Sequence, residues 1–221
     1  MLNRRHVLLA APATLLVRPA PGQIAASPPV SGLWFDPTQL PSYSGRLERW
    51  LANPSGAVDR GMFREGTQFV FAPSEAEALM QAILPGSPIC VWGIRARNAA
   101  VVLMLAWGKS DAEPAGFVER PAWFVTRVAG RELITLRGEI IAPLLTPRGE
   151  GMGVILADGG AIHLPTAAHQ ALGDMLKVGE TIFAQGQGTR RGGLAAVQAT
   201  SIGRDPSRLQ PVIAPQPEPP R

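Results

Sequence analysis

The chain repeats itself, and this repeat constrains its fold more than any other feature. When the sequence is shifted by 93 positions, residues 44–107 align with residues 137–200 without a gap, and 12 of the 64 pairs are identical. Several of these pairs are glycines at loop or strand-end positions, where the backbone needs unusual freedom. They are Gly45/Gly138, Gly56/Gly149, Gly66/Gly159, Gly86/Gly179 and Gly93/Gly186. The sequence therefore predicts two copies of one small domain.

Each copy shows the same order of predicted elements. A strand at Gly45–Ala52 or Gly138–Leu145 precedes a Pro/Gly loop and a hairpin that turns at Glu65-Gly66 or Asp158-Gly159. A helix with one apolar face follows, and then two closing strands, near 88–94 and 100–107 or near 181–187 and 194–202. This is the order of an OB barrel. The predicted fold is mostly β, with two tandem five-stranded OB-like barrels, each with one helix between strands 3 and 4.

The hairpin turns also predict a pairing register. With a two-residue turn, Ile155 would lie opposite Ile162, and Met62 opposite Phe69. The predicted domain limits are 1–26 for a signal peptide, 32–108 for the first barrel and 132–204 for the second. Residues 109–131 form a linker with room for an extra strand at Ala122–Val128, and residues 205–221 form a proline-rich disordered tail.

The first 26 residues have the pattern of an export signal. Arg4 and Arg5 precede the short apolar run Val7–Val17, and Ile24-Ala25-Ala26 is a small-residue cleavage site. The stretch Asn3–Leu8 matches a twin-arginine signal loosely, and an ordinary secretory signal is the alternative. The apolar run is too short to cross a bilayer. We expect an exported, periplasmic protein with no membrane span after cleavage.

The basic charge of the chain lies mostly in this leader. Three of its arginines and no acid fall within residues 1–26, so the formal net charge of +4 drops to +1 when they are removed. A protein that grips a phosphate backbone usually shows a clear basic excess. The remaining chain shows none, which disfavours nucleic acid as the main partner.

Catalytic groups are scarce. After the leader, the chain has two histidines, His163 and His169, and one cysteine, Cys90. Their spacing matches no triad, phosphate loop or metal motif. Cys90 lies in a predicted strand and is expected to be buried as a small hydrophobe. We therefore predict no enzyme, no cofactor and no metal.

The second copy carries a candidate ligand site. Its first loop contains Arg148 and Glu150, and its last loop contains Arg190 and Arg191. His163 alternates with Ile162 and Leu164, so it points away from the interior that those two share. In an OB barrel these positions converge on one surface, where charge-assisted hydrogen bonds could hold an anionic or polar ligand. The alternative is that the arginines are ordinary solvated residues and that Arg148 pairs with Glu150.

The first copy holds most of the aromatic residues. A single-stranded nucleic-acid site would stack bases on such rings. Phe69 and Phe71 alternate in step with the apolar residues of the second copy, which predicts core positions, whereas Trp50 and Trp92 have the polar or turn-forming counterparts Pro143 and Gln185. Packing in the core or between the barrels is the favoured role, and we expect the two barrels to pack together over some of these tryptophans.

One stretch of the second copy carries a resemblance. Its residues are Pro147-Arg148-Gly149-Glu150, Gly153, Leu156, Asp158-Gly159, His163 and Pro165. This pattern resembles small exported bacterial proteins with tandem OB-fold domains, covering 138–202 well and 45–107 more faintly. The first copy departs from it with Ser55, Ala57, Val70 and Ala72.

The resemblance implies architecture more than activity. Together these observations predict an exported, non-catalytic binding or assembly protein. Its partner would be an envelope protein or a small anionic or polar ligand. The alternative function is that of a single-stranded nucleic-acid-binding OB-fold protein.

Overall fold

The structure is a computed structural model that describes residues 33, 35–36, 39–118 and 132–213. All the described residues lie within one compact unit of the chain. The predicted leader and the predicted strand at Ala122–Val128 fall outside the described residues. No helix in the described part is both long and apolar enough to cross a membrane.

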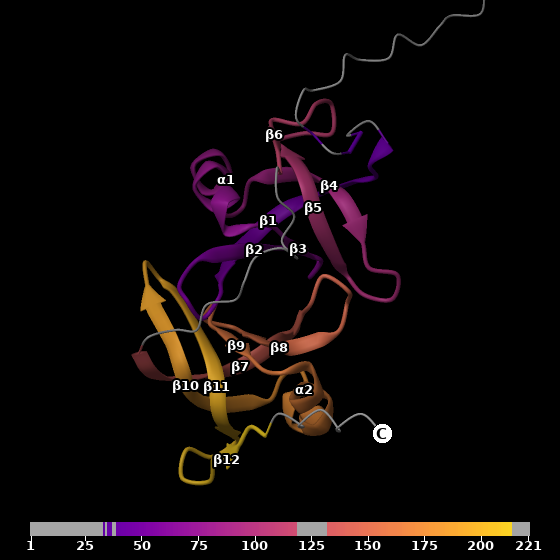
Figure 1. Cartoon of the computed structure of the whole chain (residues 1–221). Helices are drawn as coiled ribbons and strands as arrows, with labels where there is room; N and C mark the ends of the chain where they lie inside the picture. Colours follow the sequence, from indigo (N-terminus) through magenta and orange to yellow (C-terminus); the bar gives the residue numbers. More distant parts are fainter. Residues whose placement is uncertain (1–32, 34, 37–38, 119–131, 214–221) are drawn as a thin grey trace, which may run out of the picture. The chain divides into compact units, whose positions relative to one another are not determined.

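The first barrel is closed by five strands (Figure 1). They are β1 (Ser42–Ala52), β2 (Val58–Phe63), β3 (Gln68–Val70), β4 (Pro88–Arg95) and β5 (Val101–Gly108). Antiparallel pairs join β1 to β2 and β4, β2 to β3, and β4 to β5, while the parallel pair β3–β5 closes the ring. A 3-10 turn (Pro73–Glu75) and helix α1 (Ala76–Ala82) lie between β3 and β4.

The second barrel has the same topology. Its strands are β7 (Glu132–Leu145), β8 (Gly151–Leu156), β9 (Ala161–His163), β10 (Thr181–Arg191) and β11 (Leu194–Gly203). Helix α2 (Thr166–Leu172) and a 3-10 turn (Gly173–Leu176) separate β9 from β10, and the parallel pair β9–β11 closes the ring. Strands β8 and β9 begin and end 93 positions after β2 and β3. The predicted tandem OB-like barrels are confirmed.

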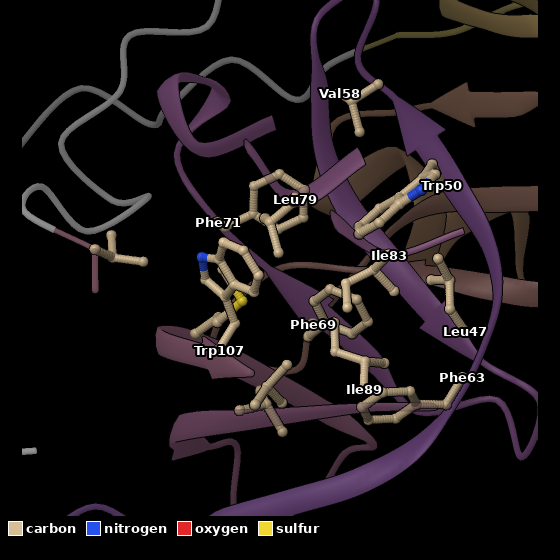
Figure 2. Close-up of a cluster of buried hydrophobic side chains, with 14 residues drawn as sticks. Leu47, Trp50, Val58, Phe63, Phe69, Phe71, Leu79, Ile83, Ile89 and Trp107 are labelled. Atoms are coloured by element: carbon tan, nitrogen blue, oxygen red, sulfur yellow. The ribbon is translucent and has the colours of Figure 1, made fainter. Parts of the chain in front are cut away.

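Each barrel has its own apolar core. In the first, the Trp50 ring meets Phe69 and Phe71 edge-on, with ring centroids 5.8 and 5.9 Å apart (Figure 2). Trp107 lies in the same core, whereas Trp92 packs with Cys90 under Leu40 and Phe117. The predicted core positions of Phe69 and Phe71 are confirmed, as is the burial of Cys90. These tryptophans are buried mainly by their own barrel and its flanking segments.

The gap-free alignment of the two copies is wrong in the last strand. Phe69 pairs with Val102 in the first barrel, and its counterpart Ile162 pairs with Val197 in the second. The offset is therefore 95 rather than 93 beyond the fourth strand, because the β10–β11 hairpin has two more residues than the β4–β5 connection. Gly93 and Gly186 precede this change and remain equivalent. At both positions a Cβ would lie 2.0 Å from a carbonyl oxygen of the neighbouring strand.

The predicted hairpin register is also wrong by one residue. Ile155 lies opposite Ala161, and Met62 lies opposite Gln68. The turns contain three residues rather than two, since the Leu156 N–H donates to the Gly160 carbonyl and the Gly159 N–H donates to the Leu156 carbonyl. This is the form of a type I turn followed by a left-handed glycine. As a result, Met62 and Ile155 lie on the outer faces of the barrels rather than in their cores.

Each barrel is extended by a sixth, short strand. Strand β6 (Gly116–Phe117) lies in the predicted linker and pairs with β5, and β12 (Gln210–Pro211) pairs with β11. Val118 and Val212 follow these strands and pack on the two cores. The predicted disordered tail is thus wrong for residues 205–213, because apolar and backbone contacts hold them on the second sheet; residues 214–221 lie outside the described residues.

Candidate functional site

The two barrels contact each other through reciprocal loops. A Cβ at Gly56, in the β1–β2 loop, would lie 3.0 Å from Thr189 Oγ1 at the end of β10. A Cβ at Gly149, in the β7–β8 loop, would lie 3.2 Å from the Cβ of Ala96 in the β4–β5 loop. Gly149 is the counterpart of Gly56, and Thr189 is the counterpart of Ala96. Each barrel therefore offers the same two loops to its partner, as in a two-fold symmetric dimer.

An apolar cluster fills the space between these loop contacts. Its buried members come from both barrels and are Leu51, Met62, Leu144, Met152 and Ile155. Leu51 is the counterpart of Leu144, and Met62 is the counterpart of Ile155, so the cluster follows the same approximate symmetry. Ala52 of the first barrel also packs with Ala161 and Ala196 of the second. The outer faces of the second and third strands are thus covered in both barrels.

Two buried polar residues break the symmetry of this interface. The Gln68 side chain donates to the Pro143 carbonyl at 2.7 Å and accepts from the Leu145 N–H at 3.2 Å. Arg60 Nη1 donates to Gln68 Oε1 at 2.9 Å and also to the Leu145 carbonyl. The counterparts of Arg60 and Gln68 in the second barrel are Gly153 and Ala161. Sequence reasoning missed this pair, although long polar residues at positions that are glycine and alanine in the second copy are a usable signal.

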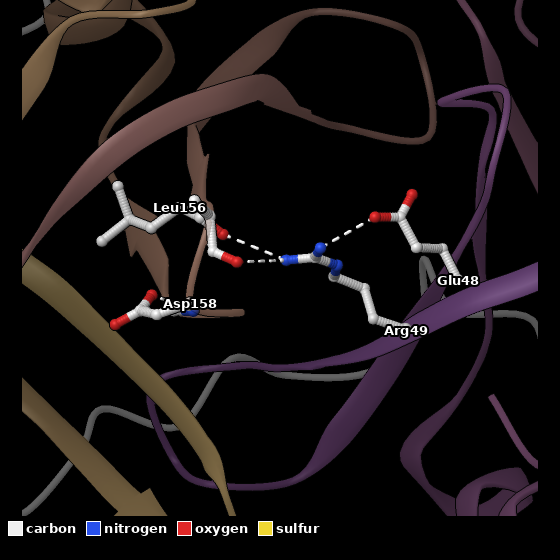
Figure 3. A network of polar contacts seen from close by, with 6 residues as sticks. Glu48, Arg49, Leu156 and Asp158 are labelled. Carbon is white, nitrogen blue, oxygen red and sulfur yellow. Dashed lines mark hydrogen bonds and ion pairs between the residues drawn. The ribbon is translucent and has the colours of Figure 1, made fainter.

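Arg49 forms another contact between the barrels. Its Nη1 donates to the carbonyls of Leu156 and Ala157, at 3.2 and 3.1 Å, and its Nη2 contacts Glu48 Oε1 at 2.8 Å (Figure 3). Both acceptors lie at the start of the β8–β9 turn. The sequence predicts a turn at Asp158-Gly159, and this position is correct. Glu48 balances the charge of Arg49, so this contact joins the barrels without leaving a net charge.

His163 points away from the barrel core, as alternation predicts, but only 4 % of it is exposed. Ile162 and Leu164 belong to the core of the second barrel. By the same alternation, His163 shares a face of β9 with Ala161, which packs on the first barrel. The expectation that His163 lies on an open ligand surface is wrong, because its side chain is buried.

His169 lies beside the same strands. A Cβ at Gly151 would be 2.2 Å from His169 Cε1, so the imidazole packs against the backbone of β8. Burial lowers the pKa of His169, and a hydrogen bond with the backbone of Gly153 partly opposes this. Within the described part of the chain, no three His, Cys, Asp or Glu residues gather in a way that could hold a metal ion.

The four charged candidates divide between two loop contacts. Arg148 and Glu150 are exposed and flank Gly149, beside the β4–β5 loop that carries Arg97. Arg190 and Arg191 are exposed at the tip of β10, next to Thr189, which meets the loop of Gly56. Arg190 Nη2 donates to the Thr135 carbonyl at 3.3 Å. The ion pairs found among the described residues do not include Arg148 with Glu150.

The fold and the paired faces define a class of protein with two OB-like barrels closed on each other. Comparison with known proteins adds no closer assignment, since no family model, curated protein or solved structure matches this chain.

Proposed function

We propose that the chain is an exported, non-catalytic binding or assembly protein that works with its two barrels closed. The reciprocal loop contact of Gly56 with Thr189 and of Gly149 with Ala96 carries this proposal. OB domains bind ligands on the strand 2–3 face and on the loops that flank it. Here those faces pack against each other, so ligands and partners would meet the exposed outer parts of the loops.

The positions of the reactive side chains support a role without catalysis. Cys90 is buried beside Trp92 and Ala106, where solvent and substrate do not reach its thiol. Buried thiols in apolar surroundings are inert. His163 is buried, and His169 packs on β8. The leader pattern in residues 1–26 supports export, and the resemblance to exported bacterial proteins with tandem OB-fold domains agrees with it.

The burial of the aromatic rings weighs against the nucleic-acid alternative. Trp50, Phe69 and Phe71 are core residues of the first barrel. Base stacking needs rings that are open to the ligand. A nucleic-acid strand on the usual OB face would also have to separate the barrels and expose the charge of Arg60. The closed arrangement therefore favours other ligands.

A disulfide that crosslinks the two barrels would test whether the protein binds its partners while the barrels stay closed on each other. Ala52 and Ala161 belong to one buried cluster and come from different barrels, so we would make the double variant A52C/A161C in the mature chain, residues 27–221. Oxidised and reduced forms would be used as bait for partners from the native envelope, with A52C alone as the control. We expect the oxidised form to recover the same partners as the wild type.

Two results would contradict this mode. Partner recovery that is lost on oxidation and regained on reduction would show that binding needs open faces. Failure of the disulfide to form would show that the two alanines are not neighbours. Export is tested separately by fusing residues 1–30 to a reporter that is active only outside the cytoplasm, with Arg4→Lys/Arg5→Lys as the control for the twin-arginine route. A silent wild-type fusion would remove the export part of the proposal.

A further inference from the structure

We infer that one edge of the interface binds a small anion with several phosphate groups. This edge is the arginine rim, which consists of Arg95, Arg97 and Arg148. The inference rests on the proposed binding function and names a ligand class for it. The rim combines two arginines of the first barrel with one of the second, so neither barrel forms it alone.

The loop contact brings these arginines together. Gly149 directly follows Arg148, and a Cβ there would lie 2.7 Å from the Cβ of Ala99 and 3.2 Å from that of Ala96. Arg97 lies between these two alanines, and Arg95 ends β4 just before them. The backbone of the Gly149 loop therefore packs against the methyl groups of Ala96 and Ala99. Long arginine side chains on both sides can reach a common ligand.

The positive charges of the rim are not paired with other groups of the described structure. Arg95, Arg97 and Arg148 are exposed, and within the described residues no hydrogen bond or ion pair holds their guanidinium groups. Glu150 is the carboxylate that accompanies them in the two loops, so positive charge exceeds negative charge here. A guanidinium group presents paired N–H donors that match phosphate oxygens. Several adjacent phosphates would satisfy the rim better than a single charge.

The approximate symmetry of the interface supplies an internal comparison. At the opposite edge, Ser55 stands in the place of Arg148, and Gly188 stands in the place of Arg95. Arg190 is the counterpart of Arg97, and there it donates to the Thr135 carbonyl. The concentration of unengaged arginines is thus a property of one edge. It is not a general feature of the loops of this fold.

Inorganic tripolyphosphate is the probe that tests this site. We would titrate it into the mature chain by calorimetry at about 20 mM salt, where charge interactions are weakly screened, and at about 200 mM salt, where they are strongly screened. The variant is R97Q/R148Q, and R190Q/R191Q is the control that removes the same charge from the opposite edge. We expect binding that weakens with salt and that falls about tenfold in R97Q/R148Q, since exposed ion pairs are individually weak. The control should change it less than about twofold.

The outcomes separate this inference from the proposed function. The inference would be overturned if tripolyphosphate did not bind, or if both double variants lost the same affinity for it. Export and partner recovery are decided by their own tests and would not be affected. A ten-residue oligothymidylate is the second probe. If it bound more tightly than tripolyphosphate and depended on Arg97 and Arg148, the rim would be a nucleic-acid site and the small-anion inference would be wrong. Unchanged thermal unfolding would show that the variants remain folded.

Discussion

Gly149 of the second barrel packs on Ala99 of the first, with only 2.7 Å between the Ala99 Cβ and the place that a Cβ on Gly149 would take. The φ angle of Gly149 is +90°, in the left-handed region that favours glycine. Two separate requirements therefore fall on this residue. The turn needs its backbone conformation, and the partner barrel needs its lack of a side chain.

The substitution G149A should separate these two requirements when it is compared with G159A. Gly159 has nearly the same φ, +88°, but open space around it. We expect G159A to cost about 1 kcal/mol of unfolding free energy through backbone strain alone. G149A should cost about 2–4 kcal/mol, because its methyl group also displaces the Ala99 loop. Urea denaturation of both variants would measure this, and equal costs would argue against the loop contact.

Gln68 should contribute strongly to stability because it satisfies buried groups of both barrels. The substitution Q68A leaves the Leu145 N–H and the Pro143 carbonyl without this partner and removes an acceptor from buried Arg60. We expect a loss of about 2–4 kcal/mol in the free energy of unfolding. The exposed Gln187 provides the control, and Q187A should change it by less than about 0.5 kcal/mol.

The double variant R60A/Q68A gives a sharper version of this test. Removing Gln68 alone takes one acceptor from the buried charge of Arg60, whereas removing both residues leaves an apolar surface like that of the second barrel. The double variant should therefore lose less stability than the sum of R60A and Q68A. Strict additivity in the same denaturation measurements would mean that the two side chains do not act as a pair.

His169 should make the folded state less stable in mild acid. Its pKa in the folded protein lies below the ordinary value of 6.5, chiefly because of burial. The unfolded chain therefore binds more protons than the folded chain in this range, so stability rises with pH. It should fall as the pH decreases below 6.5 and level off below the folded pKa. We expect H169Q to flatten this part of a stability–pH curve measured from pH 5 to 8, and an unchanged slope would exclude His169 as its source.

Trp50 should behave as a core residue rather than as a ligand-binding ring. It is 5 % exposed and contacts Phe69 and Phe71. We expect W50A to cost about 3–5 kcal/mol in the free energy of unfolding. Phe183 is the comparison, because its ring is half-buried under the Arg137 guanidinium, 5.2 Å from the ring centroid. F183A should cost about 1 kcal/mol, and a similarly small cost for W50A would contradict its core position.

The sequence predicts the parts of this fold that depend on local rules. Three of the five recurring glycine pairs, Gly56/Gly149, Gly66/Gly159 and Gly86/Gly179, mark turns with left-handed backbone. The alternation around Ile162 assigns the inner face of a strand correctly. It also places His163 outside the barrel core. Local rules failed where residues had to be counted across a turn. The three-residue hairpins and the longer β10–β11 connection each shifted a register that no local pattern could specify.

The candidate site depended on tertiary packing for a different reason. Alternation shows that His163 lies on an outer face, but it does not show what covers that face. The second barrel covers Gln68, Ala161 of β9 packs on Ala52 of the first barrel, and His163 is buried, so buried contacts replace an open ligand surface. Arg148 meets the loop of Arg97 for the same reason. The repeat can be read directly from the sequence, whereas the contact between the two copies depends on side chains that come together only after both barrels have folded.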